Sequence, residues 1–135
     1  MKAVTRRGFT LLELLVAMAL AALLLTFGLR GQQGQGLRSG RLDAVEALTR
    51  LQQAQEQHRS AHGLYASELA ALVGTAATSP QGRYAIALER SGGEAYRATA
   101  VAQGPQARDT ACATLTLEVQ LGFAQTGPDA SCWLR

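Results

Sequence analysis

The feature that most constrains the fold is the apolar run Phe9–Leu29, which contains a single charged residue, Glu13. As an α-helix this run is about 31 Å long at roughly 1.5 Å per residue, which matches the ~30 Å hydrocarbon core of a bilayer. The preceding residues 1–8 carry three cations and no acid, so the positive-inside rule keeps them in the cytoplasm. The sequence therefore predicts one transmembrane helix over residues 9–29, with the remaining chain on the outer side.

A cleaved secretory signal peptide is the alternative, because it also combines a basic leader with an apolar core. Two features argue against it. Glu13 lies inside the segment that would be the apolar core, and the residues Thr26–Arg30 offer no small-x-small cleavage site.

The stretch Gly8-Phe9-Thr10-Leu11-Leu12-Glu13 resembles the prepilin processing motif of type IV pilins and type II secretion pseudopilins. The resemblance implies that a prepilin peptidase removes the leader by cleaving between Gly8 and Phe9, and that it methylates the new amino group of Phe9. It also implies that Glu13, the fifth residue of the mature chain, is the acid on which assembly depends.

A carboxylate inside the hydrocarbon core of a bilayer is energetically unfavourable. It costs roughly 2.5–3.5 kcal/mol on insertion scales, so an intramembrane Glu13 is a functional residue by default. We expect it to pair with the α-amino group of Phe9 on a neighbouring subunit and to set axial register, as buried polar groups do in coiled coils. The alternative is a Glu13 that reaches the membrane interface and has no specific partner.

Charge argues against a general nucleic-acid surface. The 13 basic residues exceed the 10 acidic ones only because Lys2, Arg6 and Arg7 lie in the leader, so the mature chain has ten of each. Nucleic-acid binding needs a clustered positive excess. We therefore interpret five arginines of the second half as solvated surface and expect no nucleic-acid partner: Arg83, Arg90, Arg97, Arg108 and Arg135.

Residues 30–36 are rich in glycine and should be the weak point of the N-terminal helix, because each glycine costs a helix about 1 kcal/mol relative to alanine. Type IV pilins commonly place a helix-breaking proline near this position. This sequence has no proline there, so in this interpretation the glycines take its role. The alternative is that residues 30–36 are an ordinary flexible linker between the anchor and the head. Residues 37–63 then form an amphipathic helix that ends at Gly63. Its apolar stripe comprises Leu37, Ala44, Val45, Leu48 and Leu51, and its polar side comprises Asp43, Glu46, Arg50, Gln53 and Gln57.

No catalytic or metal constellation is apparent. His58 and His62 have helical spacing but lack the Glu of H-E-x-x-H and an obvious third ligand, so we expect neither a metal nor another cofactor. They also have no neighbouring nucleophile, and no glycine-rich phosphate loop precedes a helix. We therefore expect a protein that is not an enzyme.

Residues 64–135 are expected to form the head. Gly63-Leu64-Tyr65 resembles the turn that opens the pilin αβ-loop, which runs here to Gly82 with a short helix within Ser67–Val73 and Tyr65 packed beneath it. A hairpin turns at Ser91–Glu94. Alternation over Cys112–Leu121 then predicts a strand that buries Leu115, Leu117, Val119 and Leu121, followed by a turn at Gly122 and a short strand near Phe123–Thr126.

The two cysteines, Cys112 and Cys132, lie on the outer side, where an oxidising compartment favours a disulfide. Such a bridge contributes about 3 kcal/mol in the loop-entropy model. The segment around Cys112, with Cys132-Trp133 at the end, resembles the disulfide-closed C-terminal region of PilE-like minor pilins.

Together these resemblances imply an α+β type IV pilin fold, with a long N-terminal helix packed on a small antiparallel β-sheet. The expected protein is a minor pilin, anchored in the bacterial inner membrane with a periplasmic head, and then assembled into a pilus for adhesion, twitching motility or DNA uptake. Its implied partners are other pilin subunits, the prepilin peptidase, the inner-membrane assembly platform and the lipid bilayer. A type II secretion pseudopilin is the first alternative, and a DNA-binding minor pilin for competence is the second.

Overall fold

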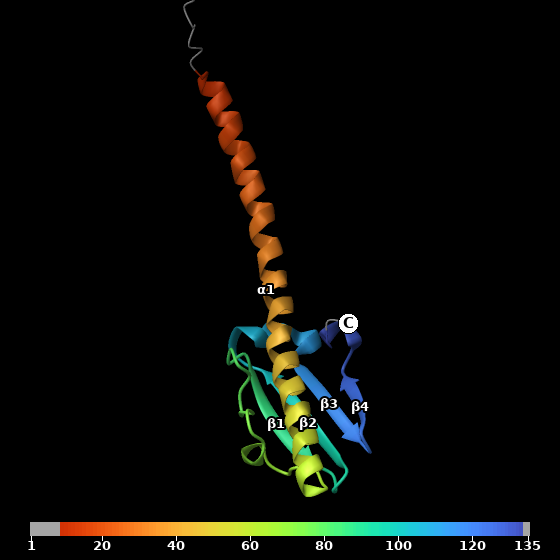
Figure 1. Cartoon of the computed structure of the whole chain (residues 1–135). Coiled ribbons are helices and arrows are strands. Elements are labelled where there is room, and N and C mark those ends of the chain that lie inside the picture. The colour runs from red at the N-terminus through yellow and green to blue at the C-terminus, as the bar shows by residue number, and fades with distance from the viewer. Residues whose placement is uncertain (1–8, 134–135) are drawn as a thin grey trace, which may run out of the picture. The chain divides into compact units, whose positions relative to one another are not determined.

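The computed structural model describes residues 9–133, with the side chains of residues 27–33 excepted (Figure 1). Gly8, on one side of the expected cleavage site, lies outside these residues. Contacts divide the chain into two compact units, and the division falls between Gln35 and Gly36. We call residues 36–133 the head.

One helix, α1 (Leu11–His62), extends over 52 residues. Its start is capped by Thr10, whose Oγ1 accepts a hydrogen bond from the backbone N–H of Glu13 at 3.3 Å, as in a capping box. It ends where Gly63 adopts a φ of +79° and donates its N–H to the carbonyl of Arg59, which confirms the predicted stop. The helix includes residues 30–36, and their predicted weakness stays a prediction.

The apolar side chains at the start of α1 are exposed, from 53% at Val16 to 78% at Leu11. Among the helical residues that the structure describes, no stretch combines the length and the apolarity needed to cross a membrane. The transmembrane helix expected over residues 9–29 stays a prediction.

The head contains a four-stranded antiparallel sheet in the order β1-β2-β3-β4, formed by β1 (Tyr84–Arg90), β2 (Ala95–Ala102), β3 (Thr114–Gln120) and β4 (Phe123–Gly127). The predicted hairpins are confirmed, with the first turn at residues 91–94 and the second at residues 121–122. The helix packs across one face of this sheet (Figure 1). The expected α+β pilin fold is therefore confirmed.

The head core lies between α1 and the sheet. From α1 the predicted stripe contributes Ala44, Leu48 and Leu51, each with no exposed surface, while Val45 is partly buried. The sheet contributes six apolar side chains, Ile86, Ala98, Ala100, Leu115, Leu117 and Val119.

Two predicted orientations are wrong. Asp43 was placed on the polar side of α1, but it is only 1% exposed, because its carboxylate accepts hydrogen bonds from the αβ-loop and replaces water with protein donors. Leu121 was placed on the buried face of β3, but it is 66% exposed with a φ of +51°. It occupies the β3–β4 turn together with Gly122, so the alternation ends one residue earlier than the sequence pattern indicated.

The αβ-loop carries one short 3₁₀ helix, η1 (Leu69–Ala71), inside the predicted range. Tyr65, at the start of the loop, is fully buried, but its hydroxyl lies against α1, donating to Glu56 and accepting from Arg59. Its ring meets that of Tyr96 on β2 edge to face at 4.8 Å. Tyr65 therefore joins the helix to the sheet, a role that the sequence analysis did not predict.

Candidate functional site

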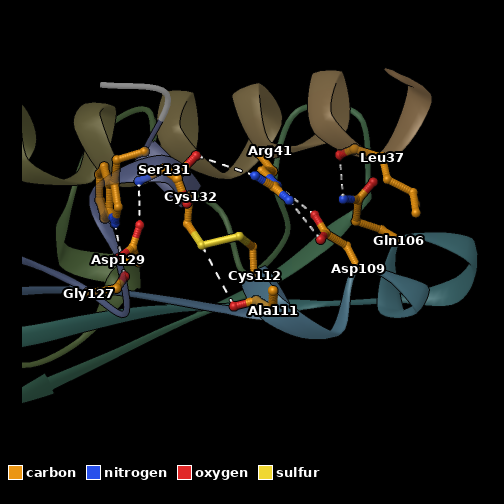
Figure 2. Close-up of a disulfide and its surroundings, with 11 residues drawn as sticks. Leu37, Arg41, Gln106, Asp109, Ala111, Cys112, Gly127, Asp129, Ser131 and Cys132 are labelled. Carbon is orange, nitrogen blue, oxygen red and sulfur yellow. Dashed lines mark hydrogen bonds and ion pairs between the residues drawn. A yellow bond between two sulfur atoms is a disulfide. The ribbon is translucent and has the colours of Figure 1, made fainter. Parts of the chain in front are cut away.

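Residues 37–41 of α1 lie beside three short 3₁₀ helices, and hydrogen bonds join them to this part of the head (Figure 2). These are η2 (Gly104–Arg108), η3 (Thr110–Cys112) and η4 (Ala130–Trp133). We call this region the junction.

Arg41 connects the helix to two of these segments. Its Nε and Nη2 donate to the two carboxylate oxygens of Asp109 at 2.7 and 2.9 Å, and its Nη1 donates to the carbonyl of Ser131 at 3.3 Å. Both partners of the ion pair are largely buried, at 16% and 7% exposure. The hydrogen bond that Arg41 donates to Asp109 raises the pKa of Arg41, against an opposing effect of burial. The charge of Asp109 is thus neutralised inside the junction.

The predicted disulfide between Cys112 and Cys132 is confirmed, with the two Cα atoms 5.5 Å apart. It joins η3 to η4, and Arg41 contacts the same two parts of the chain through Asp109, which directly precedes η3, and through Ser131 of η4 (Figure 2). The indole N–H of Trp133 donates to the carbonyl of Gly127 at 2.9 Å and ties η4 to the end of β4. The C-terminal region is therefore held by the disulfide and by two hydrogen bonds, one from Arg41 to the carbonyl of Ser131 and one from Trp133 to the carbonyl of Gly127.

Gly40 allows η2 to approach α1 closely. The side-chain amide of the buried Gln106 donates to the carbonyl of Leu37 at 2.9 Å. A Cβ atom at position 40 would lie 2.0 Å from Oε1 of Gln106 and 3.0 Å from Nη1 of Arg83, so only glycine fits without movement.

The arginines of the head differ in whether they form an ion pair. Three of them pair with a glutamate, as Arg50–Glu46, Arg59–Glu94 and Arg97–Glu118. Four form no ion pair within residues 9–133: Arg38 and Arg108 at the junction, Arg83 directly before β1, and Arg90, whose Nη1 donates to the carbonyl of Tyr65 at 3.0 Å. Arg38 and Arg108 are exposed and Arg83 is half-buried.

Three acids lie near these arginines. Asp43 and Asp109 are buried and engaged in internal hydrogen bonds. Asp129 is exposed, and the backbone N–H of Ser131 lowers its pKa, so it keeps a negative charge at the surface.

The sequence-predicted residues are only partly brought together. Of the five arginines considered as a DNA surface, Arg108 lies at the junction and Arg83 lies directly before β1. Arg90 and Arg97 lie on the strands of the sheet, and Arg135 lies outside the described range. Arg38, Gly40 and Arg41 were missed, because nothing in the helical pattern distinguishes them from an ordinary solvated face.

The two histidines stack on each other, with ring centroids 4.2 Å apart. Nδ1 of His58 lies 3.0 Å from the carbonyl of Leu64. Within residues 9–133 no group of three potential metal ligands is found. Phe9 is 82% exposed, and it lies with Glu13 in the other unit, outside the head.

Two family models match the chain. Residues 33–116 match the type IV minor pilin ComP, DNA uptake sequence receptor, and this range covers more than half of the sequence. The chain belongs to the ComP family of type IV minor pilins. Residues 5–29 match the prokaryotic N-terminal methylation motif. No curated protein matches the chain.

The prediction of a minor type IV pilin is therefore confirmed, and the family is one of structural subunits. The expectation that nucleic acid is no partner is not supported, since the matching family is described as a DNA receptor. Arg38, Arg83 and Arg108 lie inside the matched range.

Proposed function

We propose that this minor pilin acts in DNA uptake and that its head binds double-stranded DNA. The observation that carries the proposal is the match of residues 33–116 to the ComP family, because that range contains the head from α1 to the first residues of β3. The family description favours this function over the type II secretion pseudopilin and over adhesion or twitching motility. We assign the chain no catalytic role.

A neutral mature chain is compatible with DNA binding. Affinity for the phosphate backbone depends on how many cations can reach it together, and the overall sum of charges is secondary. In this head the neutrality arises largely from paired glutamates along the helix and the sheet and from buried aspartates. Arg38, Arg83, Arg90 and Arg108, which form no ion pair within residues 9–133, remain for contacts with phosphates.

The N-terminal unit supports the same function by anchoring and assembly. We propose that the peptidase cleaves between Gly8 and Phe9 and methylates Phe9, that the helix after the cleavage site anchors the subunit in the inner membrane, and that the head is periplasmic. The match of residues 5–29 to the methylation motif supports this order of events. Pairing of Glu13 with the Phe9 amine of a neighbouring pilin subunit would then set register in the filament, after transfer from the assembly platform.

The DNA proposal is tested with the full-length protein in an uncharged detergent, by fluorescence anisotropy with a labelled DNA duplex. We expect binding whose log affinity falls linearly with log salt concentration. No binding at 50 mM salt would end the proposal. Competition by duplexes of different sequence then shows whether the head discriminates between sequences.

The processing proposal is tested separately by intact-mass analysis of the protein from membranes with and without the prepilin peptidase. We expect loss of residues 1–8, one added methyl group and the mass deficit of one disulfide. An uncleaved chain in the presence of active peptidase would contradict it and leave the DNA proposal standing.

A further inference from the structure

We propose that His58 and His62 bind one divalent late transition-metal ion at the C-terminal end of α1, through the Nε2 atoms of both rings. The proposal goes beyond DNA uptake and does not depend on it. The two imidazole rings lie against each other, with ring centroids 4.2 Å apart and an angle of 22° between their planes. The structure therefore places two of the side chains that such ions prefer next to each other on one helix.

The hydrogen bonds of the two rings determine which nitrogen is available to a metal. Nδ1 of His58 lies 3.0 Å from the carbonyl of Leu64, and Nδ1 of His62 lies 3.0 Å from the carbonyl of His58. A carbonyl oxygen can only accept, so each Nδ1 carries the proton and donates it. In the neutral rings both Nε2 atoms then keep a free lone pair. A backbone carbonyl is a usual second partner of metal-binding histidines, because it fixes the tautomer and makes the other nitrogen a better ligand.

The spacing of the two residues allows both Nε2 atoms to reach the same ion. Residues four apart on a helix share a face and have Cβ atoms about 5–6 Å apart. The two histidines of H-E-x-x-H zinc sites have the same spacing. The stacked rings are close to parallel, so binding requires the ring of His62 to tilt toward that of His58. Because His62 is exposed in the last turn of the helix, this tilt disturbs no buried side chain.

The charges around the pair are compatible with a bound cation. The last carbonyl groups of a helix form the negative end of its dipole, which attracts cations. Arg59 lies between the two histidines in sequence, and its positive charge opposes a metal ion. Its guanidinium, however, lies over the ring of Tyr65 at 5.2 Å from the centroid, and its Nη2 lies 3.6 Å from Oε1 of Glu94. Glu94 therefore balances part of this charge.

The metal class follows from the ligands. From the sequence we expect no metal here, because no third protein ligand is apparent, and none joins the pair within residues 9–133. The paired tautomers change this expectation, since water can occupy the remaining positions around the ion, as it does in open zinc sites. Imidazole suits Cu²⁺, Ni²⁺ and Zn²⁺, whereas Mg²⁺ and Ca²⁺ prefer oxygen ligands. The Irving–Williams order places Cu²⁺ first in affinity.

The test titrates Cu²⁺ into the untagged full-length protein in an uncharged detergent and compares it with two variants. His62→Gln removes one ligand. The spacing control, Ser60→His/His62→Gln, keeps two histidines at positions 58 and 60, but residues two apart on a helix do not face each other. Calorimetry measures the affinity, and electron paramagnetic resonance counts the nitrogens bound to Cu²⁺. Thermal unfolding without metal is recorded for each protein.

We expect the wild type to bind one Cu²⁺ per chain through two nitrogens, to bind Zn²⁺ more weakly and not to bind Mg²⁺. Each variant should bind Cu²⁺ about 100-fold more weakly and through one nitrogen, because a second ligand on the same scaffold raises affinity by roughly 10²–10⁴. Cu²⁺ should also raise the unfolding temperature of the wild type more than that of either variant.

Two results would overturn the proposal. Equal Cu²⁺ affinity of the wild type and the spacing control would show that the two imidazoles bind independently. A single bound nitrogen in the wild-type spectrum would show that the rings do not converge on one ion, and this measurement decides even where a variant fails to fold. DNA binding is not a readout here, so a failure of the proposed function leaves this test unaffected.

Discussion

Helix α1 contains two stretches, residues 11–26 and residues 37–62, that differ in composition and in burial. Residues 11–26 are almost wholly apolar, yet every one of their side chains is exposed within the chain. Residues 37–62 alternate polar and apolar groups, and one stripe of that stretch is fully buried against the sheet. The first stretch thus has no core of its own within the subunit, whereas the second is part of one.

The difference shows where each stretch obtains its stabilisation. Helices are held mainly by packing of an apolar face, which contributes about 25 cal/mol per Å² removed from water. For residues 37–62 the subunit itself provides that burial. For residues 11–26 it must come from a membrane or from other subunits, which agrees with the proposed anchoring and assembly.

The largest expected effect comes from matched leucines in the two stretches. Leu48→Ala removes a side chain with no exposed surface and should lower the free energy of unfolding of the head by about 3–5 kcal/mol. Leu15→Ala, at a position 57% exposed, should change it by no more than about 0.5 kcal/mol. Urea unfolding followed by the fluorescence of Trp133, the single tryptophan, reports on the head alone. Equal destabilisation by both changes would contradict the comparison.

Two acids of α1, one from each stretch, should differ in the same way. Asp43→Ala removes the acceptor of hydrogen bonds from Ser79 and from two backbone N–H groups. It should lower the free energy of unfolding of the head by about 3 kcal/mol, because buried donors lose their partner. Glu13→Ala should leave the unfolding of the head unchanged and reduce incorporation into filaments, measured by the pilin content of sheared filaments.

Asp43→Asn serves as the control for this pair, because it keeps one acceptor oxygen, while it removes the charge and replaces the other oxygen with an NH2 group. The free energy of unfolding of the Asp43→Asn head should lie between those of the wild type and of Asp43→Ala. Destabilisation of the head by Glu13→Ala would show that this residue acts within the subunit and would argue against its proposed role between subunits.

Local patterns predicted the parts of this molecule that depend on neighbours in sequence. The motif from Gly8 to Glu13 indicated the family, and period-2 alternation located β3. The C-terminal pair Cys112–Cys132 was predicted from its compartment and from the family resemblance. In each case the signal lies in residue types that have few other reasons to occur together.

The contacts that build the junction could not be predicted, because they join distant residues whose types are common on surfaces. Arg41 and Asp109 are 68 positions apart, and either alone is consistent with a solvated charge. Asp43 was misplaced for the same reason, since its donors lie 36 to 40 residues further on. Helical periodicity places Asp43 beside the apolar stripe, and only the path of the αβ-loop decides that it is buried.

The smallest expected effects come from two glycines of α1, and they differ in sign. Gly36→Ala adds a Cβ with nothing within 4 Å, so it should stabilise the helix by about 0.5–1 kcal/mol. Gly40→Ala gains the same helix propensity, but its Cβ would lie 2.0 Å from Oε1 of Gln106, so a net loss of about 1–3 kcal/mol is expected. Urea unfolding followed by Trp133 measures both changes.

A double variant identifies the cause of the Gly40→Ala effect. Gln106→Ala removes the clashing side chain together with its hydrogen bond to Leu37, so the double variant Gly40→Ala/Gln106→Ala should be less destabilised than the sum of the two single variants. Strict additivity would show that the side chain moves aside freely and that the close approach of η2 to α1 does not require glycine.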